Sequence, residues 1–184
     1  SLYADLHFLT KRFDRDENGE KIHVHSLCGL MGLDYNQVGH YSYEHYFMAA
    51  RSLGLGQDAM EEIFRRMLFN VLVHNCDDHT KNFSFIMDQK GNWSLSPAFD
   101  LCYSYNNSNE WVNGHNMRIN GKRTDITHED LMTVGKKFNI KKRAAIFMEV
   151  KSVVDKFTEY ALQNKVMQPL IDQVEKNRPR ILAS

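Results

Sequence analysis

Cysteine and long apolar runs are scarce in this 184-residue sequence, and each absence excludes a class of protein. The three cysteines, Cys28, Cys76 and Cys102, form no Cys-x-x-Cys pair, so we expect neither a disulfide framework nor a zinc ribbon. No apolar run approaches the roughly 18 to 20 residues of a membrane span, and the opening residues lack the pattern of a secretion signal. These absences favour a soluble protein of the reducing cytoplasm.

An excess of charge is also missing, because 23 basic and 23 acidic side chains cancel. Without a global positive field, we expect neither direct nucleic-acid binding nor attachment to an anionic membrane surface. Apolar residues make up 42% of the sequence and charged residues 25%, which is typical of a globular protein. Proline is scarce and no linker interrupts the chain, so we predict one domain over residues 1–184.

Helical periodicity is the strongest pattern in the sequence. Apolar residues repeat every three and four positions from about Asp58 to Asn75, which predicts a helix with one buried face. Ser26 and Ser42 stand where helix N-caps are expected, and Thr127 begins a capping-box spacing. We predict helices over 26–32, 42–54 and 58–75, from Thr127, over 145–161, and from Pro169.

Turn-forming residues separate several short apolar runs, which predicts β-hairpins. We expect these hairpins at 8–24 with a turn at 16–19, at 83–95 with a turn at 88–92, and at 116–122 with a turn at Asn120-Gly121. The predicted fold class is therefore mainly α with small β-hairpins, an α+β protein.

A cluster of polar residues, Asn75 to Asn82, follows the long apolar helix, and we call it the polar loop. It contains Asp77 and Asn82, and Asp100 follows the next hairpin. In a phosphotransferase, one aspartate takes the proton of the attacking hydroxyl, while an asparagine and a second aspartate hold magnesium, which prefers hard oxygen ligands. The alternative is that these side chains only solvate a turn.

The polar loop resembles the catalytic loop of the HipA-type toxin kinases. The run NCDDHTKNFS at 75–84, followed by LSPAFDL at 95–101, is similar to that family's catalytic loop and metal-binding segment. Two further runs agree in order: RFDR at 12–15 resembles the family's hinge between lobes, and MRINGK at 117–122 resembles its late hairpin. The resemblance implies the helical C-terminal lobe of a protein-kinase-like fold.

The resemblance also implies a role for individual residues, with ATP and Mg²⁺ as cofactors. By this resemblance the site residues are catalytic Asp77 and Lys81, nucleotide-binding Phe13, Asp14 and His79, and magnesium-binding Asn82 and Asp100. Asp14 has a second interpretation, since it can pair with Arg12 or Arg15 on a solvated strand.

The sequence has no counterpart of the glycine-rich turn and the lysine that a complete kinase places over the nucleotide phosphates. We therefore expect a C-terminal lobe that starts at the interlobe hinge, with the N-terminal lobe supplied in cis or in trans. Alone, the chain should bind nucleotide weakly and be inactive or nearly so, because phosphoryl transfer depends on positioning.

The resemblance further implies a serine/threonine kinase that is the toxin of a toxin–antitoxin system. The implied partners are a protein substrate, which in this family includes aminoacyl-tRNA synthetases, and a helix-turn-helix antitoxin. Two other functions stay open, a metal-dependent phosphohydrolase and a non-catalytic helical interaction module. The hydrolase would hold its metal ions with His74, Asp77, Asp78, His79 and Asp100.

Overall fold

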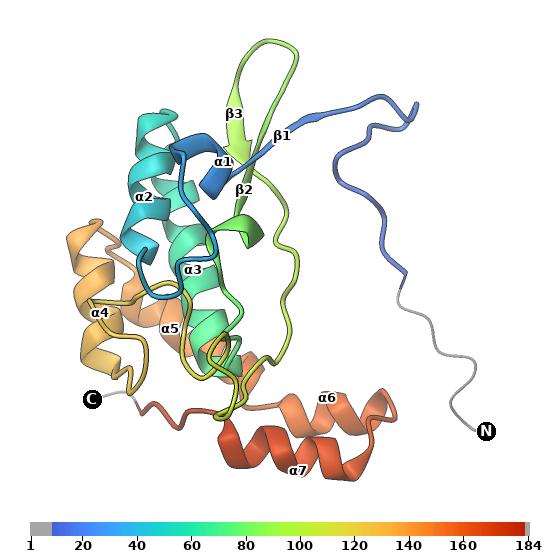
Figure 1. Ribbon diagram of the computed structural model, residues 1–184, viewed down its shortest axis with the longest axis vertical. Helices are drawn as coiled ribbons and strands as arrows, with labels where there is room; N and C mark the ends of the chain where they lie inside the picture. The colour runs from blue at the N-terminus through green and yellow to red at the C-terminus, as the bar shows by residue number, and fades with distance from the viewer. Residues whose placement is uncertain (1–8, 183–184) are drawn as a thin grey trace.

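The computed structural model describes residues 9–182, which form a mainly helical fold with one small sheet (Figure 1). The helices are α1 (Leu27–Met31), α2 (Tyr43–Ser52), α3 (Gln57–Val73), α4 (His128–Lys137), α5 (Arg143–Val154), α6 (Phe157–Gln163) and α7 (Gln168–Asn177), with a 3-10 turn, η1 (Thr80–Asn82). The strands are β1 (His23–Ser26), β2 (Ser84–Met87) and β3 (Trp93–Leu95). The prediction of a mainly α protein with small β elements is confirmed.

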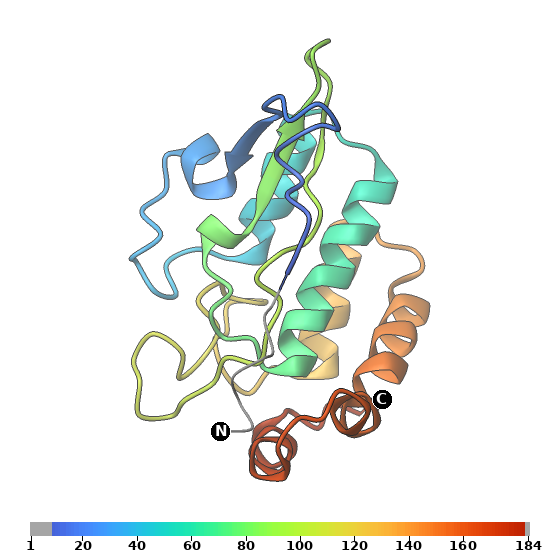
Figure 2. The same cartoon turned by 90° about the vertical axis from the view of Figure 1, so that its right-hand side faces the viewer.

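Helix α3 forms the centre of the apolar core. Its predicted stripe is buried, with Ile63, Phe64 and Met67 fully inaccessible to solvent. It packs against α2 and, more extensively, against α5, and Figure 2 shows it running through the middle of the molecule, between the β2–β3 hairpin and helices α6 and α7. The helix ends at Val73, two residues before the predicted end, because His74 adopts a left-handed φ of 60°.

The predicted helix starts are confirmed at each of three caps. The Ser26 hydroxyl accepts a hydrogen bond from the Gly29 amide, and Ser42 closes a capping box with the side chain of His45. Thr127 and Asp130 form the second capping box at the start of α4. These local bonds satisfy amide groups that no helical carbonyl can reach.

The sheet is antiparallel and its strand order is β1–β2–β3. The predicted hairpin of β2 and β3 is confirmed, with Ile86 opposite Ser94. The predicted hairpin at 8–24 is wrong for β1, which pairs with β2 through Val24 and Ile86 instead of folding back on the opening segment. Of that expected hairpin, the described residues keep only a bridge between Arg15 and Lys21 around the 16–19 turn.

Two other expectations need correction. The helix predicted over 145–161 is divided into α5 and α6. The Arg178 guanidinium donates to the Val154 carbonyl at 2.8 Å, and this bond replaces the one that a backbone amide would donate in a continuous helix. The hairpin at 116–122 is reduced to a tight turn that Ile119 and Lys122 close with two backbone bonds of 2.9 and 3.0 Å.

Two features of the outline bear on the site. Helices α6 and α7 lie together at the base, away from the sheet, while residues 9–22 run apart from the helical body (Figure 1). Within residues 9–182, every helix is too short or too polar to cross a membrane.

Candidate active site

The polar loop begins where α3 ends and leads through η1 into β2. The segment that follows Asp100 lies beside its first residues, since the Cys76 amide donates to the Ser104 carbonyl at 2.9 Å. The Ser104 amide in turn donates to the His74 carbonyl at 3.2 Å. This pairing brings Asp100, which follows β3, next to the polar loop.

The structure brings Asp77, Asn82 and Asp100 close to one another. Asn82 and Asp100 line one small cavity. The side-chain amide of Asn82 donates to the main-chain carbonyl oxygen of Asp77 at 3.0 Å. Burial raises the pKa of the Asp77 carboxyl; the charge of His79 opposes this shift, and the charge of Asp100 adds to it. The carboxylates of Asp77 and Asp100 are therefore close enough to interact electrostatically.

The same cavity offers the donor set that Mg²⁺ requires. The carboxylate of Asp100 and the amide oxygen of Asn82 are hard oxygen ligands. Asn75 also lines the cavity, and its side-chain oxygen Oδ1 is buried without a hydrogen-bond partner. A buried oxygen without a donor is costly unless a cation or water satisfies it. These residues fit a magnesium ion.

Asp78, next to Asp77 in the chain, has a different environment. It is 1% exposed, and its carboxylate accepts three hydrogen bonds. The donors are the Tyr43 hydroxyl at 2.8 Å, the His115 ring at 2.9 Å and the Asn116 amide at 2.7 Å. Asp78 thereby fastens the polar loop to α2 and to the segment around residue 116.

A buried chain of hydrogen bonds continues from Asp78 to Asp100. The Tyr43 hydroxyl accepts from the Asn70 amide at 3.0 Å, and the Asn70 oxygen accepts from Asn75 at 3.0 Å. The Asn75 amide also donates to the Asp100 carbonyl at 3.2 Å. Sequence reasoning missed these residues, although Asn70 carried a signal, because it is a polar side chain on the apolar stripe of α3.

The predicted nucleotide-binding residues on the opening segment have fewer contacts. The Phe13 ring lies 5.6 Å from the ring of Phe99, which places it beside Asp100. The Asp14 carboxylate accepts from Arg12 Nε at 2.7 Å and from Arg15 at 2.8 Å. The bond from Arg12 lowers the pKa of Asp14 to about 2. Asp14 is thus paired with both arginines, and its ribose role stays a prediction.

His79 is partly buried in the polar loop, and Lys81 is exposed on it. The His79 Nε2 atom is 3.7 Å from Asp77 Oδ1, so the imidazole stands beside the candidate catalytic carboxylate. The Lys81 ammonium lies 4.9 Å from the centre of the Tyr35 ring. That ring also contacts His79, with 5.8 Å between ring centres. Tyr35, on the segment between α1 and α2, was not predicted.

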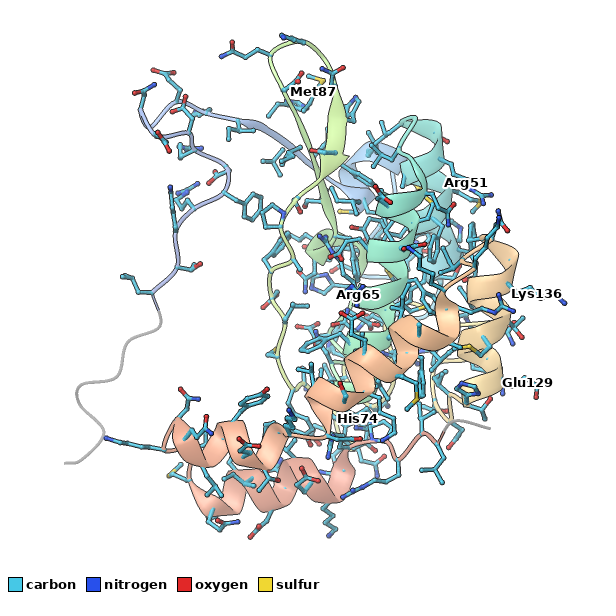
Figure 3. The ribbon with its side chains drawn as sticks, turned by 180° about the vertical axis from the view of Figure 1, so that it is seen from behind. Arg51, Arg65, His74, Met87, Glu129 and Lys136 are labelled. Carbon is cyan, nitrogen blue, oxygen red and sulfur yellow. The ribbon has the colours of Figure 1, made fainter. Side chains whose placement is uncertain are left out.

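The ligands expected of a phosphohydrolase are not gathered at one point. Asp78 is occupied by its three donors, and the His74 ring stacks on Tyr105 at 3.9 Å. His74 lies at the end of α3, close to helices α6 and α7 (Figure 3). Burial lowers its pKa to about 4. Across residues 9–182, no three histidine, cysteine, aspartate or glutamate side chains are grouped to hold a metal ion.

Comparisons with known proteins point to one family. A family model described as the HipA-like C-terminal domain matches residues 2–164. The chain is 31% identical over 109 residues to a protein of Haemophilus influenzae named "Putative kinase", covering 54% of this chain. It is 34% identical over 93 residues to "Putative kinase Y4dM" of Sinorhizobium fredii, covering 50% of this chain.

A solved structure shares the fold. It comes from Shewanella oneidensis MR-1 and is described as a toxin–antitoxin system complex of HipA, HipB and operator DNA. The match has a TM-score of 0.63 and 20% identity, and covers 94% of this chain but 42% of the solved one. The matched region likewise spans 31% and 22% of the two curated relatives. These relatives are therefore much longer than the region that they share with this chain.

Proposed function

This chain belongs to the HipA-like C-terminal domain family, and from that premise we propose that it is the magnesium-binding, catalytic-loop lobe of an ATP-dependent serine/threonine protein kinase. The observation that carries the proposal is that Asn82 and Asp100 line one small cavity and that Asp77 lies beside them, bonded to Asn82 and within reach of the Asp100 charge. Two curated relatives with kinase names support it.

In this proposal each residue has a distinct task. Asp77 accepts the proton of the attacking hydroxyl, and its raised pKa improves it as a proton acceptor near neutral pH. Asn82 and Asp100 hold Mg²⁺, which when bound neutralises charge on the nucleotide phosphates. Lys81 and His79 supply positive or hydrogen-bonding groups beside Asp77, and Phe13 and Asp14 face the nucleotide base and ribose.

The rest of the kinase is proposed to come from an N-terminal lobe, in cis or in trans, that covers the nucleotide phosphates. The relatives support this, because the matched region makes up less than half of each. The structure that holds HipA with HipB and DNA supports an antitoxin partner for this chain. A protein hydroxyl, with an aminoacyl-tRNA synthetase as one candidate substrate, completes the proposal.

Calorimetric titration with ATP and Mg²⁺ tests the proposal. This chain alone should bind weakly, and a protein that also carries the N-terminal lobe should bind tightly. Asp100→Asn should abolish magnesium-dependent binding while keeping the fold, because asparagine tolerates the left-handed φ of 56° at this position. The matched control is Asp88→Asn, in the exposed turn between β2 and β3, which should bind normally.

Phosphoryl transfer provides the second readout. In the protein with both lobes, Asp77→Asn should lower the transfer rate at least about 100-fold, the usual contribution of a general base, with ATP binding retained. If neither form of the protein binds magnesium and nucleotide, the interaction-module function is the better account. Transfer by this chain alone would contradict the need for a second lobe.

A further inference from the structure

Tyr35 is an aromatic side chain of the α1–α2 segment that contacts the polar loop. Its ring contacts His79 at 5.8 Å between centres and the Lys81 ammonium at 4.9 Å. The side chain is 39% exposed, so it is not part of the apolar core. One ring thus contacts two polar-loop side chains, of which His79 lies beside Asp77.

The segment that carries Tyr35 is firmly held. The Asp34 amide donates to the Tyr41 hydroxyl at 3.0 Å, and the Gly39 amide donates to the Asn116 carbonyl at 2.8 Å. Asn116 is also a donor to Asp78. Gly39 has a φ of 68°, and a Cβ atom there would clash with the Arg123 side chain, so that side chain packs directly on the Gly39 backbone. The segment is therefore bonded at Gly39, four residues after Tyr35, to the same Asn116 that holds the polar loop.

We propose that Tyr35 is a positioning residue of the kinase site, which holds His79 and Lys81 in the orientation that leaves the Asp77 carboxylate open to the acceptor hydroxyl. The proposal rests on the proposed kinase function. His79 is already 3.7 Å from Asp77. Without the ring, the flexible Lys81 side chain loses the contact that orders it and no longer keeps one orientation beside the polar loop.

The size of the effect follows from the contact that is lost. A cation over an exposed aromatic ring is stabilised by roughly 0.5–1 kcal/mol, which corresponds to about a two- to fivefold change in rate. Tyr35→Leu should therefore lower kcat for phosphoryl transfer by about two- to fivefold and leave the KM for ATP unchanged. Tyr35→Phe, which keeps the ring, should restore the wild-type kcat.

The test uses the full-length protein that contains this chain, with kcat and KM measured for each variant. Tyr160→Leu is the matched control, since Tyr160 is 43% exposed and lies on α6, away from the polar loop. A spectroscopic readout accompanies the kinetics: the ε-methylene protons of Lys81 should show a ring-current shift in the wild type and in Tyr35→Phe, and lose it in Tyr35→Leu.

The outcomes separate this inference from the function on which it rests. A wild-type protein without transfer activity overturns the proposed function, and this inference with it. An active wild type whose Tyr35→Leu variant keeps full kcat overturns the positioning role alone. A Tyr35→Phe variant as slow as Tyr35→Leu also overturns it, because the hydroxyl and not the ring would then be responsible.

Discussion

Two acidic segments reach the candidate site, and the structure holds them in different ways. The polar loop is tied to α2, to α3 and to the segment around residue 116 by buried hydrogen bonds. Residues 11–15 stand apart from the helices and contact the site through the Phe13–Phe99 pair, with Asp14 bound to its own neighbours. The proposed magnesium ligands, Asn82 and Asp100, are thus held in place by the fold. The proposed nucleotide-binding residues, Phe13 and Asp14, are held by far fewer contacts.

The same contrast exists within the polar loop itself. Asp77 has a side chain that is 45% exposed, whereas that of Asp78 is fully buried and meets three donors. A buried carboxylate that accepts three hydrogen bonds contributes to folding, and a half-exposed one is available for chemistry. We therefore expect Asp78 to contribute mainly to stability and Asp77 mainly to function.

The largest expected effect is at Asp78. Asp78→Ala should lower the free energy of unfolding by about 3–5 kcal/mol, because it leaves the Tyr43, His115 and Asn116 donors buried without their acceptor. Asp77→Ala, the matched control, should change it by less than about 1 kcal/mol. Urea unfolding measures both. Equal losses from the two variants would contradict the division.

His74, at the anchored end of the polar loop, should give a smaller and pH-dependent effect. Burial holds its folded-state pKa at about 4, below the unfolded value of about 6.5, so the unfolded chain binds a proton first as the pH falls. Stability should therefore decrease from about pH 6.5 to pH 4, by about 1–2 kcal/mol after allowance for partial exposure.

The variant His74→Asn tests that assignment. Asparagine tolerates the left-handed φ at this position and does not titrate, so the variant should lose the slope between pH 6.5 and 4. Its stability near neutral pH should fall modestly because the stacking on Tyr105 is lost. A slope that persists in the variant would show that another group titrates in this range.

The smallest effect is expected at Asp14. Its pKa is lowered to about 2 by Arg12, but the pair is solvent-exposed, and exposed ion pairs contribute little to folding. Asp14→Asn should therefore leave the urea midpoint of this chain unchanged within error. A clear loss of stability would show that the opening segment is anchored as firmly as the polar loop, and would remove the contrast between them.

Local signals explain what the sequence could predict. The α3 stripe, the three helix caps and the β2–β3 hairpin each depend on residues a few positions apart. The order Asp77, Asn82, Asp100 was visible for the same reason, as these residues lie on one loop and just after one hairpin. The resemblance of the whole run to a kinase loop then suggested their roles.

Long-range partners explain what the sequence could not predict. Asp77 and Asp78 look alike in the chain, and only the donors to Asp78, which are 35 to 38 residues away, distinguish them. The pairing of β1 with β2 and the contact of Tyr35 with the polar loop join segments that local periodicity cannot relate. The break between α5 and α6 likewise depends on Arg178, far along the chain.

We propose above all that this chain carries a prebuilt magnesium site at Asn82 and Asp100, beside the candidate base Asp77. Paramagnetic broadening by Mn²⁺ with ATP, recorded on the isotope-labelled chain, tests it most directly because it detects weak binding residue by residue. We expect the amides around these three residues to broaden first, and Asp100→Asn to remove the effect. Broadening centred elsewhere, or unchanged in Asp100→Asn, would contradict the claim.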